Sequence, residues 1–447
     1  MERPVTVGVL SLHSSKETKA IINTVNELGH EGVWLREENL VVNIKDNGIV
    51  VEPNVDVIVN RLLLSKTEQP SELLGLAKSL GRLRPMLNRP ENVLTAFHKF
   101  ATATAMGDTD VRIPDALLAL DADRLNDERT RFGDEVVYKT AIGTHGGGTW
   151  KIGPGETVNP RVGDRFAFLQ ELIEQNEEHR HSDLRVYIVD DEIVAAMNRY
   201  APENDWRTNV ALGGDVEGVE EVPEEAAKMA LEAADILGLD YAGVDLVKGV
   251  KGWYLLEVNP TAGFKGLFKA TGVSPAPQIA KLAIETGGGE VDDETVERLS
   301  AVLDDSMPPD VPRRRPSARE DRKTIGYTEE VLVSGTSGTE RVVSKSDTGA
   351  SRTSIDTRLA AKIGAGPIKS MTKVKSGSVK GGKARPVVDI VVGIGGDRHT
   401  VAASLEDRGH MEYPLLLGRD ILQDYQVDVR RSIEDDDDEA TTDEEEE

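Results

Sequence analysis

The sequence LDYAGVDLVKGVKGWYLLEVNPTAGF, residues 239–264, decides the fold of the longer part of this chain. Residues 242–248 and 253–258 have the apolar and β-branched composition of strands, and the Gly-Val-Lys-Gly between them has the composition of a tight turn. The segment therefore predicts a β-hairpin, whose register the sequence leaves open.

Three oxygen-bearing side chains on this hairpin are suited to holding a metal ion. Glu257 and Asn259 are two residues apart, so both point to the same face of the second strand. Asp245 lies on the first strand, close to opposite them if the turn is short. Mg²⁺ prefers hard oxygen ligands, usually one or two carboxylates with phosphate oxygens and water. The alternative is a surface hairpin with ordinary outward polar residues.

A second group of residues, upstream of the hairpin, is suited to binding phosphate. Glu135-Val-Val-Tyr-Lys139 has the composition of a short strand and runs into the glycine-rich turn GTHGGG at 143–148. Backbone N–H groups of such a turn can approach phosphate oxygens, and a nearby lysine adds positive charge. No Gly-Lys-Ser/Thr follows, so this is not a Walker loop. On its own the turn also fits a plain hairpin tip.

The order of these motifs resembles that of the ATP-grasp enzymes. The strand ending in lysine and the glycine loop are followed by Gln170-Glu-Leu-Ile173, Asp183-Leu-Arg185, Arg207-Thr-Asn209 and Glu257-Val-Asn-Pro. Within that superfamily the chain looks most like the RimK type, which adds glutamate to a carboxylate on a ribosomal protein or a related acceptor. The resemblance is dense over residues 88–280 and loose over residues 1–87.

The resemblance implies roles for the residues of these motifs. Those implied in binding ATP are Lys99, Lys139, Gly146, Gly147, Gly148, the backbone of Glu171 and Leu172 at the adenine edge, Asp183 near the ribose, Arg207, Thr208 and Asn209. Arg207 and Arg199 are candidate catalytic residues, because an arginine aimed at a transferring phosphoryl group neutralises its developing charge. Asp245, Glu257 and Asn259 are the implied ligands of Mg²⁺ or Mn²⁺.

The implied reaction has two steps. An acceptor carboxylate attacks the γ-phosphate of ATP, giving an acyl phosphate and ADP, and the amine of an amino acid, expected to be L-glutamate, then displaces phosphate. Positioning and charge neutralisation carry the first step. We therefore interpret the chain as an ATP-dependent ligase that forms C–N bonds. The acceptor is either a protein or a small molecule such as a pterin or deazaflavin coenzyme.

The first 87 residues alternate strand and helix patterns. Apolar strands are expected at 5–10 and 55–59, and helices at 16–28 and 71–80. Strands separated by helices predict a small, mostly parallel α/β layer. The resemblance implies that this layer is the pre-ATP-grasp domain, which forms one wall of the acceptor site.

Residues 88–284 make the predicted ATP-grasp domain. A single helix is expected to start after Pro90-Glu91 and to continue through Lys99 to Met106. The lysine stands where the family has a phosphate-binding lysine, and the alternative is an ordinary exposed helix residue. His179 and His181 are interpreted as part of a polar loop, because no third metal ligand is spaced for them.

A different domain follows a proline- and charge-rich linker at 285–323. Residues 324–430 are full of short strands, and their markers are Asp347-Thr-Gly-Ala350 and Pro414-Leu-Leu-Leu-Gly-Arg-Asp-Ile-Leu422. This domain resembles the retropepsin-like family of ATP-dependent zinc proteases. The predicted fold class is therefore α/β followed by a small β-barrel domain.

Asp347 is the candidate catalytic residue of this barrel. The chain has one Asp-Thr-Gly, so a pair of aspartates sharing a proton would need a homodimer. Ile355-Asp356 stand where the family has a histidine, and zinc has only His399 and His410 as possible ligands. The alternative is a barrel for dimerisation or substrate docking.

The composition sets the broad class of the protein. The chain has 447 residues, no cysteine and a formal net charge of −26. The acidity argues against direct nucleic-acid binding and fits a halophilic protein, whose excess carboxylates are screened by salt. No apolar run of membrane-spanning length is present, so we expect a soluble, cytoplasmic protein, without a membrane partner and forming a homo-oligomer.

The last residues, 431–447, are nearly all Asp and Glu, and we expect them to be a disordered tail. Two rival functions remain open on the sequence. One is an aspartic-type peptidase regulated by an ATP-binding half, and the other is a non-catalytic, nucleotide-gated binding protein.

Overall fold

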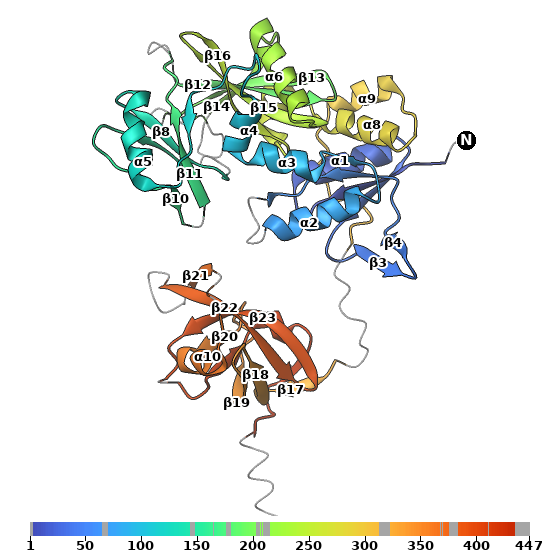
Figure 1. The fold of residues 1–447 in the computed structure, drawn as a ribbon. Helices are drawn as coiled ribbons and strands as arrows, with labels where there is room; N and C mark the ends of the chain where they lie inside the picture. Colours follow the sequence, from blue (N-terminus) through green and yellow to red (C-terminus); the bar gives the residue numbers. More distant parts are fainter. Residues whose placement is uncertain are drawn as a thin grey trace, which may run out of the picture. The chain divides into compact units, whose positions relative to one another are not determined.

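The structure is a computed structural model of the 447-residue chain (Figure 1). It describes residues 3–64, 70–143, 148–163, 165–175, 180–202, 206, 208, 215–312, 322–366, 368, 370–374, 383–409 and 411–433. The chain divides into two compact units, Met1–Arg313 and Arg314–Glu447. In the described residues no helix combines the length and the apolar character needed to cross a membrane.

A parallel sheet forms the start of the first unit, as the sequence predicts. Its order is β2-β1-β5-β6, and its strands are β1 (Thr6–Leu10), β2 (Glu31–Leu35), β5 (Val57–Asn60) and β6 (Met86–Leu87). The central strands β1 and β5 are mostly apolar because both faces of the sheet are covered. Helix α1 (Lys16–Glu27) packs on one face and α2 (Pro70–Gly81) on the other.

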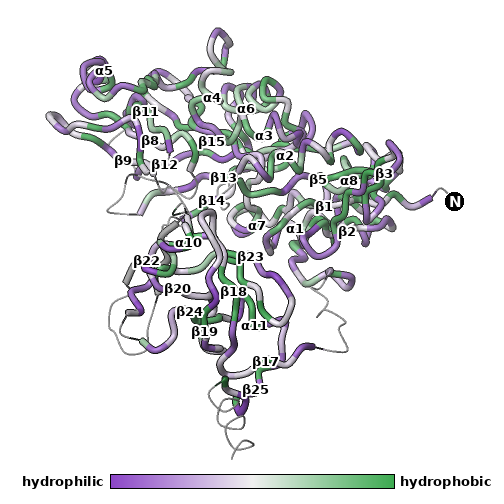
Figure 2. Tube along the Cα trace, turned by 60° about the horizontal axis from the view of Figure 1, so that its bottom comes forward, coloured by the Kyte–Doolittle hydropathy of each residue, from purple (hydrophilic) through white to green (hydrophobic). Residues whose placement is uncertain are grey.

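The core on the α1 face joins this layer to the rest of the unit. Helix α8 (Ala276–Thr286) lies beside α1 (Figure 1), and its buried face packs with the apolar residues of β1 and β5. Figure 2 shows the hydrophobic residues concentrated in these elements. The same core includes Tyr187 and Tyr241, which belong to the larger antiparallel sheet described below. Residues on both sides of position 87 therefore share one core.

A hairpin near this layer differs from the expectation. A hairpin that was not predicted, β3 (Val41–Lys45) and β4 (Gly48–Glu52), turns through Asp46 and Asn47, both at positive φ. Asp-Asn-Gly is a turn signal that favours such a hairpin.

The prediction of one continuous helix over residues 90–106 is wrong. The chain forms α3 (Pro90–Phe97) and α4 (Lys99–Ala105), separated by His98 in an extended conformation. The His98 Nδ1 accepts a hydrogen bond from the Ala101 backbone N–H (3.1 Å) and so caps α4. The Lys99 backbone N–H donates to the Ala141 carbonyl (2.8 Å). This tertiary bond takes the place of a helical one and fixes the start of α4.

Two antiparallel sheets carry the rest of the first unit. The smaller sheet contains β7 (Ala116–Leu117), β8 (Val136–Thr140), β9 (Thr149–Ile152), β10 (Arg161–Val162) and β11 (Arg165–Glu171). The larger has the order β14-β13-β12-β15-β16, and its strands are β12 (Ser182–Val189), β13 (Glu192–Tyr200), β14 (Asp215–Val219), β15 (Tyr241–Gly249) and β16 (Gly252–Asn259). The β15–β16 pair is the predicted hairpin, with Gly249 opposite Gly252.

Alternation along β12 separates the core from a polar face. Leu184 and Val186 pack in a core that includes helix α6 (Glu224–Ile236). Successive side chains of a strand point to opposite faces, so Asp183 and Arg185 lie on the other face. That face carries the candidate site.

The second unit is a closed barrel of six strands, with β21 (Ser370–Val374) added at its side. The ring runs through β18 (Thr328–Ser334), β19 (Thr339–Ser346), β24 (Leu415–Leu417), β20 (Ser354–Asp356), β23 (Asp397–Glu406) and β22 (Lys383–Ile394), which pairs again with β18. Helices α10 (Thr357–Ile363) and α11 (Arg419–Leu422) pack on its apolar core. This confirms the predicted retropepsin-like barrel fold. Most of the acidic tail, 434–447, lies outside the described residues.

Asn88 fastens the hairpin to the N-terminal layer. It is completely buried, has φ +56° and directly follows β6. Its Nδ2 donates to the carbonyls of Tyr241 and Pro260 (2.9 Å each), at the start of β15 and just past the end of β16. Its Oδ1 accepts from the backbone N–H groups of Asp240 (2.9 Å) and Tyr241 (3.2 Å). One side chain thus satisfies four backbone groups, three of them in buried hydrogen bonds.

We expect Asn88→Ala to lower the free energy of unfolding of the first unit by about 3 kcal/mol, because buried backbone groups lose their partners. Calorimetry or urea unfolding measures the change. Asn43→Ala, at an exposed position of β3, is the matched control. A loss no larger than that of the control would contradict the role given to Asn88.

Candidate active site

A cavity of about 1600 Å³ opens in the first unit. Its walls come from the N-terminal layer, the smaller sheet and the polar face of the larger sheet. It contains most of the described residues that the sequence singles out, and these are Lys99, Lys139, Glu171, Leu172, Asp183, Arg199, Thr208, Asp245, Glu257 and Asn259. Arg207, Asn209, Gly146 and Gly147 lie outside the described residues.

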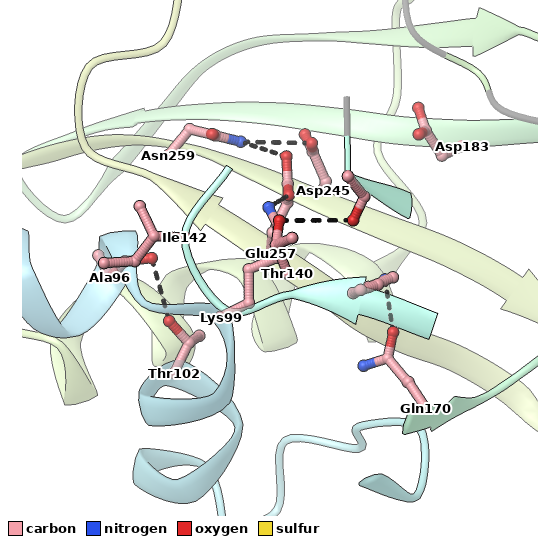
Figure 3. Close-up of polar contacts among 12 residues, drawn as sticks. Ala96, Lys99, Thr102, Thr140, Ile142, Gln170, Asp183, Asp245, Glu257 and Asn259 are labelled. Atoms are coloured by element: carbon pink, nitrogen blue, oxygen red, sulfur yellow. Dashed lines mark hydrogen bonds and ion pairs between the residues drawn. The ribbon is translucent and has the colours of Figure 1, made fainter. Parts of the chain in front are cut away.

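The β15–β16 pairing brings the three predicted oxygen ligands together. Asp245 is directly opposite Glu257, and Gly243 is opposite Asn259. The Asn259 Nδ2 donates to Asp245 Oδ2 (3.3 Å) and to Glu257 Oε1 (3.1 Å), as Figure 3 shows. A register shift follows Asp245, so the alignment of these side chains is local to the end of the hairpin.

Two arginines hold Asp245 from the neighbouring strands. Arg185, opposite Asp245 on β12, donates from Nε and Nη2 to its two carboxylate oxygens (2.5 Å each). Arg199 on β13 donates to both oxygens of Asp183 (2.6 Å each), and its Nη2 lies 2.9 Å from Asp245 Oδ2. The Thr208 hydroxyl also donates to Asp183. The result is a buried chain of alternating charges across three strands.

Sequence reasoning missed Arg185, although it is part of the Asp183-Leu-Arg185 motif. The available signal was its spacing, because residues two apart on a strand share a face. What the sequence did not supply was the β12–β15 register, which sets Arg185 against Asp245.

Glu257 is paired with Lys99, the first residue of α4. The Lys99 Nζ forms an ion pair and hydrogen bond with Glu257 Oε2. Burial alone would raise the pKa of the Glu257 carboxyl, but the Lys99 charge and hydrogen bond, together with Arg185, hold that pKa well below its usual range. Glu257 is therefore ionised at neutral pH.

Lys139 on β8 reaches the same cavity from the smaller sheet. Its Nζ donates to Gln170 Oε1 on β11 (2.5 Å). Burial and the neighbouring Lys99 charge lower the pKa of Lys139 to about 8, against the opposing pull of Glu257 and Asp245. Lys99 pairs with Glu257, whereas the Lys139 ammonium donates to a neutral amide, so this part of the cavity offers positive charge to an anion.

The glycine loop is described only at its two ends, Gly143 and Gly148, and Gly148 has φ +88°. A Cβ there would lie 2.4 Å from the Thr140 Oγ1, so a larger residue would not fit this turn. On β11, the Glu171 backbone N–H donates to the Asp115 carbonyl (2.8 Å), and Leu172 lines the cavity beside it.

The donor set at the end of the hairpin fits a hard divalent cation. Asp245, Glu257 and Asn259 offer two carboxylates and an amide, the kind of partial shell that phosphate oxygens and water complete around Mg²⁺. The described residues contain no group of three or more His, Cys, Asp or Glu that could hold a metal by themselves. His181 lines the cavity, and His179 is outside the described residues.

In the second unit, Asp347 is held by its own turn. Its Oδ1 accepts from the backbone N–H groups of Gly349 (2.8 Å) and Ala350 (3.2 Å). Of the two candidate zinc ligands, His399 shares a hydrogen bond with the Tyr425 hydroxyl (2.6 Å), and His410 is not described.

The comparisons with known proteins agree with this architecture. The RimK-like ATP-grasp domain matches residues 99–283, and the retropepsin-like aspartic endopeptidase RimB matches residues 363–436. Tetrahydromethanopterin:alpha-L-glutamate ligase of Methanocaldococcus jannaschii is 33% identical over 218 residues, which are 46% of this chain and 73% of that protein. "Probable alpha-L-glutamate ligase 2" of Shewanella amazonensis is 30% identical over 296 residues, 62% of this chain and 94% of that protein.

Among solved structures, the ATP-grasp ligase PsnB complexed with minimal precursor, Mg and ADP superposes with a TM-score of 0.51 at 18% identity, covering 64% of this chain and 99% of that one. This likeness supports the ATP-grasp fold. The fold and the matched domain define an ATP-grasp ligase, an enzyme that forms C–N bonds. The chain belongs to the RimK-like family of these ligases, and its second unit carries a RimB-like retropepsin domain.

The unusual environment of Lys139 can be measured directly. An NMR titration of the lysine side chains should show one group with a pKa near 8, because burial and Lys99 disfavour its charged form. Lys99→Met should raise this pKa by removing a like charge. Glu257→Gln should lower it by removing a favourable negative charge. An ordinary value of 10.5 in the unmodified protein would contradict the assignment.

Proposed function

We propose that this protein adds L-glutamate to a carboxylate of an acceptor, using ATP and Mg²⁺ or Mn²⁺ and releasing ADP and phosphate. One observation carries the proposal: Asp245, Glu257 and Asn259 face Lys99 and Lys139 in a single cavity. The relatives named alpha-L-glutamate ligase support glutamate as the amino acid. The Mg and ADP in the PsnB complex support the nucleotide and the metal.

The roles of the residues follow from their partners. Asp245, Glu257 and Asn259 would hold a divalent cation, which would supply positive charge against the negative charge of the phosphates. Lys99 and Lys139 would contact the same phosphates as point charges. Lys99 pairs with Glu257, so phosphate binding would exchange one anion for another around its ammonium.

Arg199 is better explained as a positioning residue. Its guanidinium is buried, donates hydrogen bonds to Asp183 and forms an ion pair with Asp245. Arg199 therefore orients the Asp245 carboxylate, a proposed metal ligand, and is not aimed at the phosphoryl group. Arg185 acts in the same way from the other side. Arg207 remains the proposed arginine for the transferring phosphoryl group.

The cavity is large enough for more than a nucleotide. Pockets that bury a drug-sized ligand have volumes of about 300 to 1,000 Å³, whereas this one has about 1600 Å³. That leaves room for the amino acid and for the end of an acceptor. A protein tail and a small coenzyme both meet this requirement.

We expect Glu257→Gln to reduce acceptor-dependent ADP release by at least about 100-fold, because it weakens the metal shell and frees Lys99. The purified protein would be assayed in high salt with MgATP, L-glutamate and candidate acceptors, with the mass gain of the acceptor as second readout. Glu225→Gln, at an exposed ion pair with Arg112, is the matched control. ATP binding without turnover on any acceptor would favour the nucleotide-gated binding protein.

Proteolysis by the barrel is a second candidate function, favoured by the RimB-like match and by the Asp347 turn. If the barrel cleaves peptides, Asp347→Asn should abolish cleavage, and Glu257→Gln should leave it intact. A peptide library read by mass spectrometry provides the assay. Cleavage that survives Asp347→Asn would exclude Asp347 as the catalytic residue, and absence of cleavage by the unmodified protein would remove this candidate.

A further inference from the structure

Arg61 is a buried arginine that forms no ion pair with the described residues. It follows β5, is 4% exposed and lines the cavity. Within the part of the chain that the structure describes, its Nε and Nη1 have no hydrogen-bond partner. Its Nη2 makes only long contacts, to the carbonyls of Thr261 (3.4 Å) and Ala262 (3.3 Å).

The surroundings of Arg61 fix its side chain without neutralising it. The guanidinium carbon lies 5.3 Å from the centre of the Phe264 ring and 6.0 Å from that of Tyr241. Among the described ion pairs, none joins Arg61 to a carboxylate. A buried charge without a partner destabilises a fold. A group kept at such a cost, at the wall of a cavity, is a candidate for binding a ligand of opposite charge.

The same wall contains the start of α1. Ser14, Ser15 and Lys16 line the cavity, and the 12-residue helix begins there with its N-terminal N–H groups and the positive end of its dipole. Lys265 adds a further positive charge. The acid on this wall, Glu17, accepts a hydrogen bond from the Phe264 backbone N–H (3.2 Å).

Chemistry and position together indicate a carboxylate. Arginine presents parallel N–H groups that match two carboxylate oxygens. Thr261, which Arg61 contacts, is two residues beyond Asn259 of the proposed metal shell, so an anion at Arg61 would lie toward the reacting groups. Lys99 and Lys139, which reach the cavity from other elements, are the proposed binding groups for phosphate, so Arg61 is not needed for that role.

We propose that Arg61 binds a carboxylate of an organic substrate, one that does not itself react. This inference rests on the proposed ligase function. The carboxylate has two possible sources with the same chemistry, the α-carboxylate of the incoming L-glutamate and a terminal carboxylate of a glutamyl acceptor. Arg61 is then a residue of substrate specificity in the N-terminal wall.

The test is calorimetric binding to the full chain saturated with ADP and Mg²⁺. The probes are L-glutamate, 4-aminobutyrate, which lacks the α-carboxylate, and γ-L-glutamyl-L-glutamate as the end of an acceptor. Arg61→Met should weaken one glutamate-containing probe about 30-fold, the size expected for a charge-assisted pair. If the source is the amino acid, L-glutamate is the probe affected, and 4-aminobutyrate binds both proteins equally. If the source is the acceptor, the dipeptide is affected.

Stability separates this role from a structural one. Arg61→Met removes an unpaired buried charge and keeps the apolar contact, so its Tm should equal or exceed that of the unmodified protein. Arg61→Lys keeps the positive charge but loses the paired N–H groups of the guanidinium. Its affinity for the affected probe should lie between those of the unmodified protein and Arg61→Met. Arg84→Met is the matched control, because all three Arg84 guanidinium nitrogens have partners. It should lower Tm and leave binding unchanged.

The outcomes are distinct. Equal affinity of the unmodified protein and Arg61→Met for all probes, absence of binding included, overturns the role of Arg61. A lower Tm for Arg61→Met together with unchanged binding by Arg61→Lys also overturns it. Failure of the unmodified protein to bind ADP with Mg²⁺ would instead count against the proposed ligase function, and is read from the saturation step alone.

Discussion

The site depends on one buried carboxylate, Asp245, shared by Arg185 and Arg199. The three side chains stand on adjacent strands, so backbone pairing and charge pairing require the same register. Removing either arginine would leave a buried charge without full compensation. Asp245 is therefore oriented before any ligand arrives, and preorganisation of this kind reduces the cost of binding. Glu257 and Asn259 lie on β16, and the pairing of β16 with β15 places them beside Asp245.

What the sequence predicts well in this chain is local. The hairpin at 239–264 and helices α1 and α2 follow from composition, turn residues and periodicity over short windows. The break at His98 does not, because the bond from Lys99 to Ala141 that stabilises it is tertiary. The grouping of Asp245, Glu257 and Asn259 was predictable from spacing, but the contact of Asp245 with Arg185 depends on a strand register that only the fold determines.

Two polar features of the barrel have local explanations. The strand before Asp347 is polar, yet Ser344 and Ser346 are buried, and their hydroxyls donate to the carbonyls of Glu329 and Gly326 (3.0 Å each). Ile355-Asp356 stand at the sequence position where the family has a histidine. The Asp356 side chain caps α10 and also accepts a hydrogen bond from the Arg408 backbone N–H (2.8 Å). These hydrogen bonds offset burial and lower the pKa of Asp356. Ser344, Ser346 and Asp356 thus stabilise the barrel through hydrogen bonds to backbone groups.

Asn88 also limits how this chain could be recombined. Because it joins the end of the N-terminal layer to both ends of the hairpin, the layer is not an exchangeable module. A recombination that replaced residues 1–87 with another N-terminal layer would have to deliver β6 to the same place, or strands β15 and β16 would lose their anchor. A change in the shape of the cavity is then more accessible through substitutions in the segments that line it than through exchange of whole segments.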